Sequence, residues 1–133
     1  MISGDTLARI RVVVLGAAGA ICALYSLGAF ALDTPRPFAW WLPAVAGVSA
    51  AVVITLSFLV AGRESAEMAT DELYRAEWGR AVQLSYWFGL ALFLLGAVAV
   101  SRGWIGQSTA IAALGTAYGA APMLAFCAIT LRS

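Results

Sequence analysis

The 133-residue chain contains no histidine and no lysine. Without histidine it lacks the usual haem ligand, the commonest zinc ligand and the usual general base near neutral pH. Without lysine it has no residue for a Schiff base and no amine nucleophile. We therefore predict a protein that is not an enzyme, with no catalytic residue, no cofactor and no metal site.

Charge is also scarce. Charged residues make up 11% of the chain and the formal net charge is +1, whereas about a quarter of the residues of an average soluble domain are charged. Hydrophobic residues make up 62% and the mean hydropathy is +0.90. So short a chain cannot hide that much apolar surface in a water-facing core, but a lipid bilayer can accommodate it. The small net charge gives no electrostatic footprint for nucleic acid.

Cysteine is limited to Cys22 and Cys127, and both lie inside apolar runs. The chain has no CxxC motif and no metal-ligand spacing. We interpret the two residues as free, buried thiols.

Four apolar runs are long enough to cross about 30 Å of hydrocarbon; they cover approximately residues 10–32, 40–62, 81–101 and 107–131. The connections between them are short, which forces neighbouring helices to run antiparallel. The pattern predicts an all-α fold. It would be a single transmembrane domain over residues 1–133, an integral membrane four-helix bundle with antiparallel up-down topology.

Arginine is distributed unevenly between the two ends of these spans. With the N-terminus in the cytoplasm, six of the eight arginines are cytoplasmic, and only Arg36 and Arg102 face out. This positive-inside bias predicts that both termini are cytoplasmic. Arginine, alanine and glycine in place of lysine are typical of a GC-rich bacterial genome. We therefore expect a multi-pass protein of the bacterial inner (plasma) membrane.

No Asp, Glu, Lys, Arg or His is expected in the interior of any span. A proton-coupled pump or exporter usually keeps one there, because that group couples substrate to proton movement. The polar residues within the spans are hydroxyl-bearing, and such groups usually bond to helix carbonyls or across helices.

Small residues mark two helices as packing candidates. Gly16 and Ala20 lie four apart in the first span, and Gly115 and Gly119 form a GxxxG pair in the fourth. Small residues let helix backbones approach closely in lipid, either inside the bundle or at an oligomer face. Pro122 lies inside the fourth span and cannot donate to the carbonyl of Tyr118, so we predict a kink there.

The segment at about 63–80 is the exception to the apolar pattern, because most of the acids of the chain lie in it. We predict a cytoplasmic helical connector capped by Thr70, with ion pairs Asp71–Arg75 and Glu77–Arg80. Two interpretations stay open: a solvated connector, or a docking surface for a partner. The candidate docking residues are Tyr74, Arg75, Trp78, Asp71 and Glu72.

The stretch DELYRAEWGRA, from Asp71 to Ala81, resembles the D-E-x-x-R-x-x-x-x-x-A entry into a span of the DUF2178-like group of small four-helix prokaryotic inner-membrane proteins. Leu73 stands where members of that group often have a basic residue. The resemblance implies membrane class and topology, and it implies no activity.

Two functions remain at this point. The first is a non-catalytic protein that acts by contact, as an accessory or assembly subunit of a larger membrane complex or as the membrane partner of a cytoplasmic regulator. Its partners would be the lipid bilayer and another membrane protein or a second copy of itself. The alternative is a minimal oligomeric channel or transporter without a titratable residue inside the membrane. If the polar side chains of the four helices line one water-filled path, the channel or transporter is favoured. If they do not, the contact function is favoured.

Overall fold

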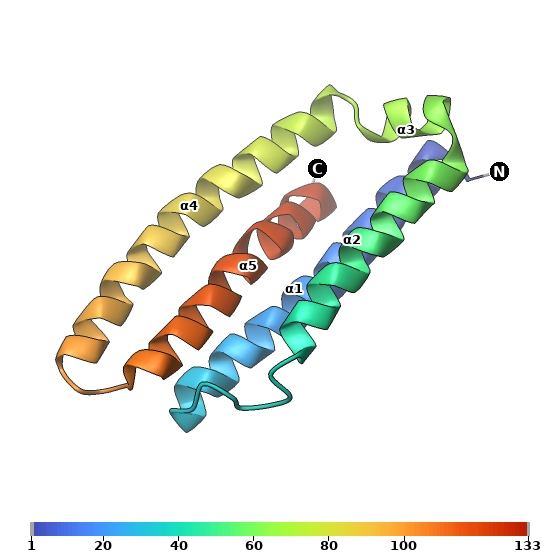
Figure 1. Ribbon diagram of the computed structural model, residues 1–133. Helices are drawn as coiled ribbons and strands as arrows, with labels where there is room; N and C mark the ends of the chain where they lie inside the picture. Colours follow the sequence, from blue (N-terminus) through green and yellow to red (C-terminus); the bar gives the residue numbers. More distant parts are fainter. Residues whose placement is uncertain (1, 133) are drawn as a thin grey trace.

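The computed structural model describes residues 2–132, and every regular element in that range is an α-helix. The helices are α1 (Gly4–Leu32), α2 (Leu42–Ala61), α3 (Arg63–Ala69), α4 (Glu72–Ser101) and α5 (Gln107–Arg132) (Figure 1). Four of them, all except α3, are long and apolar enough to cross a membrane. The two end residues of the predicted domain, Met1 and Ser133, lie outside the described range.

The helices begin and end close to the predicted spans, and the longest ones extend beyond them. α2 has 20 residues, or about 30 Å at 1.5 Å per residue, which matches the hydrocarbon thickness. α1 has 29 residues and α4 has 30, so both exceed that thickness by roughly 13 to 15 Å. α1 starts early because Ser3 caps it: the Thr6 amide donates to the Ser3 hydroxyl at 3.3 Å.

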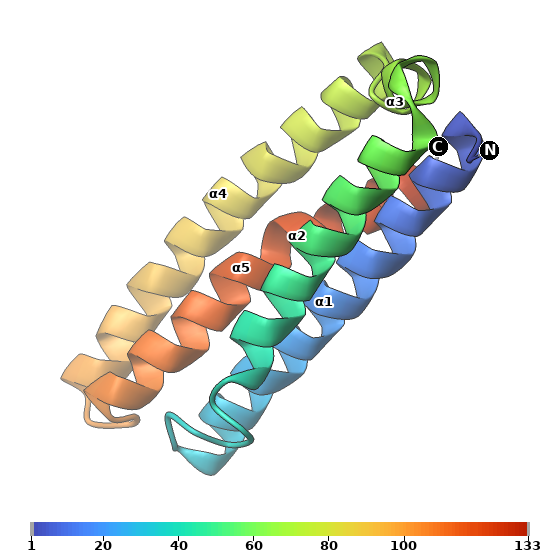
Figure 2. The same cartoon turned by 45° about the vertical axis from the view of Figure 1, so that its right-hand side comes forward.

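The four long helices pack in the order α2–α1–α5–α4. α1 packs most extensively against α5, α5 also packs against α4, and α1 packs against α2. The first and last helices of the chain therefore form the centre, and α2 and α4 form the edges (Figure 2). The start of α1, the end of α5 and α3 lie at the same end of the molecule, here named the α3 end. The opposite end, here named the loop end, carries residues 33–41 and 102–106.

The segment predicted as a connector is helical on both sides of a break, and the predicted cap at Thr70 is wrong. It consists of α3, a break at Thr70 and Asp71, and the first turns of α4. Thr70 ends α3, and its hydroxyl donates to the Ala66 carbonyl at 2.8 Å. Asp71 is the N-cap of α4, since its carboxylate accepts from the Tyr74 amide at 2.9 Å. The aspartate is the better cap because a charged acceptor at a helix N-terminus also interacts favourably with the helix dipole.

Neither predicted ion pair in this segment forms. Asp71 is engaged as a cap instead of pairing with Arg75, and Glu77 faces inward instead of toward the exposed Arg80. Within residues 2–132 the structure shows one ion pair, Arg63–Glu67 at 3.0 Å, and both side chains are exposed. Such a pair contributes little to stability.

Two contacts organise the loop end. Asp33 ends α1 in the left-handed conformation, with φ 46°, and its carboxylate accepts from the Gly106 amide at 3.3 Å. The Tyr25 hydroxyl donates to the Pro35 carbonyl at 3.0 Å. The first of these bonds links the loop after α1 to the loop before α5, the two helices that form the centre of the row.

Candidate functional site

Arg11 is the most unusual residue of the structure, because it is a charged side chain on an apolar helix and only 6% of it is exposed. Its Nη1 donates to the Ala69 carbonyl, at the end of α3, at 2.8 Å. The guanidinium carbon lies 3.8 Å from the centre of the Tyr74 ring, a cation–π distance. Burying a cation is costly unless it is bonded, and these two contacts provide part of the compensation.

The Nε atom of Arg11 is the exception. It is buried, and it has no hydrogen-bond partner among the described residues. Buried hydrogen-bond donors are nearly always bonded in folded proteins, so a buried Nε without an acceptor is an exception to this rule.

An aromatic cluster packs beside the guanidinium. Phe126 of α5 is fully buried and meets the edges of two α4 rings, Tyr74 at 5.6 Å and Trp78 at 5.3 Å between ring centres. Both pairs are T-shaped, an arrangement that aromatic quadrupoles favour. The cluster joins α4 to α5, and through Tyr74 it also contacts Arg11 of α1.

Glu77 is the second buried charged residue at this end, with 6% of it exposed. Its Oε2 accepts from the Thr130 hydroxyl of α5 at 2.8 Å. Arg11 and Glu77 both line an opening of about 330 Å³ between α1, α3, α4 and α5. Asp5 and Asp71, both exposed, line it as well. The opening therefore combines one guanidinium with three carboxylates.

The predicted docking residues divide into two groups in this structure. Tyr74 and Trp78 share a face, as their spacing indicates, but the face points inward, to Phe126, and both rings are half-buried. The charged members, Asp71, Glu72 and Arg75, are exposed. Tyr74 and Trp78 therefore contribute to the packing of α4 against α5. Among the five candidates, only the three charged residues have exposed side chains.

The predicted packing glycines also divide. A Cβ at Gly16 would lie 3.6 Å from the Cys127 sulfur, an ordinary contact between α1 and α5, whereas Ala20 is exposed. Cβ atoms at Gly115 and Gly119 would meet nothing within 4 Å among the described residues. Among the glycines of α1, Gly19 has the tightest contact with α5, because a Cβ there would lie 3.0 Å from the Leu124 side chain.

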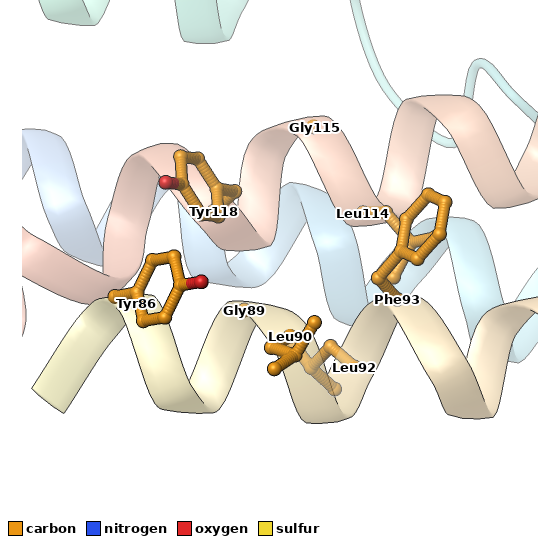
Figure 3. A pocket seen from close by; sticks show the side chains of 8 residues that line it. All are labelled: Tyr86, Gly89, Leu90, Leu92, Phe93, Leu114, Gly115 and Tyr118. Carbon is orange, nitrogen blue, oxygen red and sulfur yellow. The ribbon is translucent and has the colours of Figure 1, made fainter.

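A second opening, of about 400 Å³, lies between α4 and α5 and is lined almost wholly by apolar groups. Figure 3 shows the lining residues of the two helices, with Tyr86 and Gly89 on α4 and Tyr118 and Gly115 on α5. The Tyr118 ring covers Gly89, since a Cβ there would lie 2.5 Å from a ring carbon. Gly115 has no such cover.

Three of the hydroxyl groups within the helices donate to helix carbonyls. Ser26 donates to the Ala113 carbonyl, Ser85 to that of Ala81 and Thr116 to that of Ala112, at 2.8, 2.6 and 2.8 Å. Such bonds fix helices to themselves or to a neighbour. In the described part of the chain no three His, Cys, Asp or Glu side chains lie close enough to hold a metal ion. Pro122 lies inside α5, whose helical assignment continues past it to Arg132; the kink stays a prediction.

Comparisons with protein-family models, curated proteins and solved structures find no match to this chain. The resemblance of the Asp71–Ala81 segment to the DUF2178-like group therefore stays a prediction.

Sequence reasoning missed the residues that make the α3 end distinctive: Arg11, Glu77 and Phe126. One signal was present for Arg11, because it lies four residues after Leu7 and so shares a helix face with it. Leu7 is only 1% exposed and packs with Ala61 and Ala69. For Glu77 and Phe126 the sequence holds no comparable signal, since their partners lie about 50 residues away along the chain.

Proposed function

We propose that this protein is a multi-pass protein of the bacterial inner membrane that acts by contact, as an accessory or assembly subunit of a larger membrane complex. Both termini and α3 would lie in the cytoplasm. The distribution of arginine supports this side, because Arg9, Arg63, Arg75, Arg80 and Arg132 all belong to the α3 end, together with Arg11. Cytoplasmic segments of membrane proteins carry such an excess of positive charge.

The observation that carries the proposal is the open glycine pair on α5. Six other helical glycines have a side chain of this chain within 4 Å of an added Cβ: Gly4, Gly16, Gly19, Gly28, Gly89 and Gly96. Gly115 and Gly119 lie on a central helix of the row and yet have open space around them. In lipid, helices associate where small residues allow close backbone approach. The pair therefore favours a further transmembrane helix, from a partner or from a second copy, packed against α5.

The exposed surface agrees with this interpretation. Each edge helix packs extensively against one long neighbour only, α2 against α1 and α4 against α5. Large apolar side chains such as Leu59, Phe93 and Leu95 are more than 60% exposed. A bilayer covers such side chains, and it also gives a partner helix access to the row.

The channel alternative receives no comparable support. It needs polar side chains directed at a shared path, whereas Ser26, Ser85 and Thr116 donate to helix carbonyls. Their bonding favours a structural role for the hydroxyl groups.

The test is the mass of the particle extracted from native membranes in mild detergent. We expect the parent protein in a particle heavier than one 13.9 kDa chain, and the double variant Gly115→Leu, Gly119→Leu as a single chain. The variant should fold, because a Cβ added at either position meets no atom of the described chain within 4 Å. Gly47→Leu is the matched control, since Gly47 on α2 is equally open. A parent that migrates as a single chain, or a double variant that keeps its full assembly, would show the proposal to be wrong.

A further inference from the structure

Tyr118 of α5 carries a hydroxyl that the chain leaves unbonded. Its side chain is 57% exposed, and within residues 2–132 the hydroxyl has no hydrogen-bond partner. Its ring covers Gly89, which lies nine residues after Arg80, or about 14 Å along α4. Arg80 and Arg102 bound the uncharged part of α4, so Tyr118 lies near the middle of the roughly 30 Å of hydrocarbon. Lipid tails at that depth offer no acceptor.

The same residue also presents an acceptor without its usual donor. A helix carbonyl normally accepts from the N–H four residues later, but Pro122 has no N–H. The Tyr118 carbonyl therefore lacks that bond, and no side chain of the described residues donates to it. Gly119 is the next residue, and a Cβ there would meet nothing within 4 Å among the described residues. The backbone beside this carbonyl is thus left uncovered.

The donor and the acceptor of Tyr118 point toward the same end of α5. Figure 3 shows the ring lying along the helix, with the hydroxyl pointing away from Leu114 and so toward the C-terminal part of α5. Peptide carbonyls of an α-helix also point toward its C-terminus. The two groups therefore lie at similar depths in the membrane, although they do not bond to each other within one chain.

A second copy of the chain supplies what both groups lack. Copies in one membrane have the same orientation, so a two-fold axis between them runs along the membrane normal and places each residue at the same depth as its own copy. The hydroxyl of one Tyr118 then lies at the depth of the other's carbonyl, and the reverse also holds. No charged residue lies between Gln107 and Leu131, so two copies of this face meet without like-charge repulsion.

The exposed area of the chain is large enough for such a contact. The chain exposes 8353 Å², whereas a compact monomer of its mass, 13.9 kDa, exposes about 6,700 Å². The difference is about 1,700 Å², and each partner in a standard interface buries roughly 800 Å². One stable dimer interface therefore fits within the excess area.

We propose that the helix packed on α5 is α5 of a second copy, and that the Tyr118 hydroxyl of each copy donates to the Tyr118 carbonyl of the other. This inference rests on the proposed function, because it names the helix that packs there. The two-fold axis passes near Gly115 and Gly119, where the backbones can approach closely. A helix of another protein would have to bring a donor and an acceptor at matching depth, whereas a copy already has both.

The first experiment asks whether two copies associate through α5. Two versions of the full chain with different affinity tags are co-expressed, one is purified from native membranes in mild detergent, and we expect the other to co-purify. In a background of Cys22→Ala and Cys127→Ala, Ile111→Cys should form a disulfide-linked dimer under mild oxidation, because Ile111 lies one turn from Gly115 on the same face. Val48→Cys on α2 is the control, since Val48 and Ile111 are similarly exposed, at 65% and 68%.

The outcomes separate this inference from the proposed function. If the particle is heavier than one chain but the two tags do not co-purify, the partner is another protein, so the inference is wrong and the proposed function stands. If the particle is a single chain, both are wrong. The inference is also wrong if Ile111→Cys does not cross-link in preference to Val48→Cys, because the contact then lies elsewhere.

Two variants test the bond itself. Tyr118→Phe removes the donor and keeps the ring over Gly89, while Pro122→Ala gives the Tyr118 carbonyl a donor from its own helix. Each should weaken dimerisation by roughly three- to tenfold, although Pro122→Ala should make α5 itself more stable. The double variant should dimerise no more weakly than either single variant, since all three remove the same bond. Energy transfer between copies with different fluorescent tags, at fixed detergent concentration, measures the dimer.

Thr116→Val and Pro43→Ala are the matched controls. The Thr116 hydroxyl bonds within its own helix, and Pro43 lies in the first turn of α2, where its missing N–H leaves no helix carbonyl without a donor. Both should leave dimerisation unchanged. Additive losses in the double variant, or a Tyr118→Phe variant that dimerises as strongly as the parent, would show that the proposed bond does not join the copies.

Discussion

The two ends of the helix row are built from similar apolar helices, yet they are held together differently. At the α3 end, side chains from α1, α4 and α5 meet in one buried group, with Arg11 bonded to Ala69 and Phe126 between two α4 rings. At the loop end, Trp40 and Trp104 are 67% and 69% exposed, and a single bond of 3.3 Å joins the loops. The helices are therefore joined by buried side-chain contacts at the α3 end. At the loop end, exposed tryptophans are typical of residues at a membrane–water interface.

The proposed topology places the two ends on opposite sides of the membrane, and cysteine labelling tests it with the largest, all-or-none effect. In a background of Cys22→Ala and Cys127→Ala, single cysteines at Ser3, Glu64 and Thr34 would meet an impermeant maleimide added to intact cells. We expect labelling of the Thr34 variant alone, because we propose that the arginine-rich α3 end lies in the cytoplasm. Labelling at Ser3 from outside would reverse the topology.

Phe126→Ala should cause the largest loss of stability, about 3 to 5 kcal/mol, because it removes a fully buried ring and leaves a cavity. Phe93→Ala is the matched control on α4, where 63% of the side chain is exposed, and we expect a change below about 1 kcal/mol. Equilibrium unfolding in mixed detergent measures both. Equal losses would mean that the α3 end is not the better packed one.

Thr130→Val should cost about 1.5 to 3 kcal/mol, because it removes a hydroxyl donor from the buried Glu77 carboxylate while keeping the side-chain shape. Thr116→Val serves as its control, since that hydroxyl bonds only to carbonyls one turn earlier on its own helix. The same unfolding assay reports both variants. A neutral Thr130→Val would show that the Thr130–Glu77 bond does not stabilise the α3 end.

Asp33→Ala should have the smallest effect, at most about 1 kcal/mol, since it removes one exposed hydrogen bond at the loop end. Asp33→Asn keeps an acceptor and tolerates the left-handed conformation, so it should be closer to the parent. Thermal unfolding of the three proteins side by side gives the order. If Asp33→Ala lost as much stability as Phe126→Ala, the α3 end and the loop end would not differ in how strongly they are held.

The sequence was sufficient to predict the four long helices because their signal is composition over about 20 residues, which needs no knowledge of partners. It misplaced the cap at Thr70 because Thr70 and Asp71 are both good caps, and only the backbone geometry selects between them. The contacts of Arg11 and Phe126 at the α3 end could not be predicted from the sequence, for a different reason. Arg11 meets a carbonyl 58 residues away, and no local pattern encodes which distant element will cover a given helix face.

The pairing of α1 with α5 has a consequence for how the protein is made. Synthesis of α5 begins about 75 residues after α1 ends, which at roughly 5 to 20 residues per second is about 4 to 15 s. Throughout that interval Gly19 and Ser26 of α1 lack the helix that covers them in the finished protein. A chain that stops before residue 107 would contain α1 and α4 but lack α5, the helix that packs against both of them. An incomplete copy would therefore expose the face of α1 that α5 covers in the finished protein.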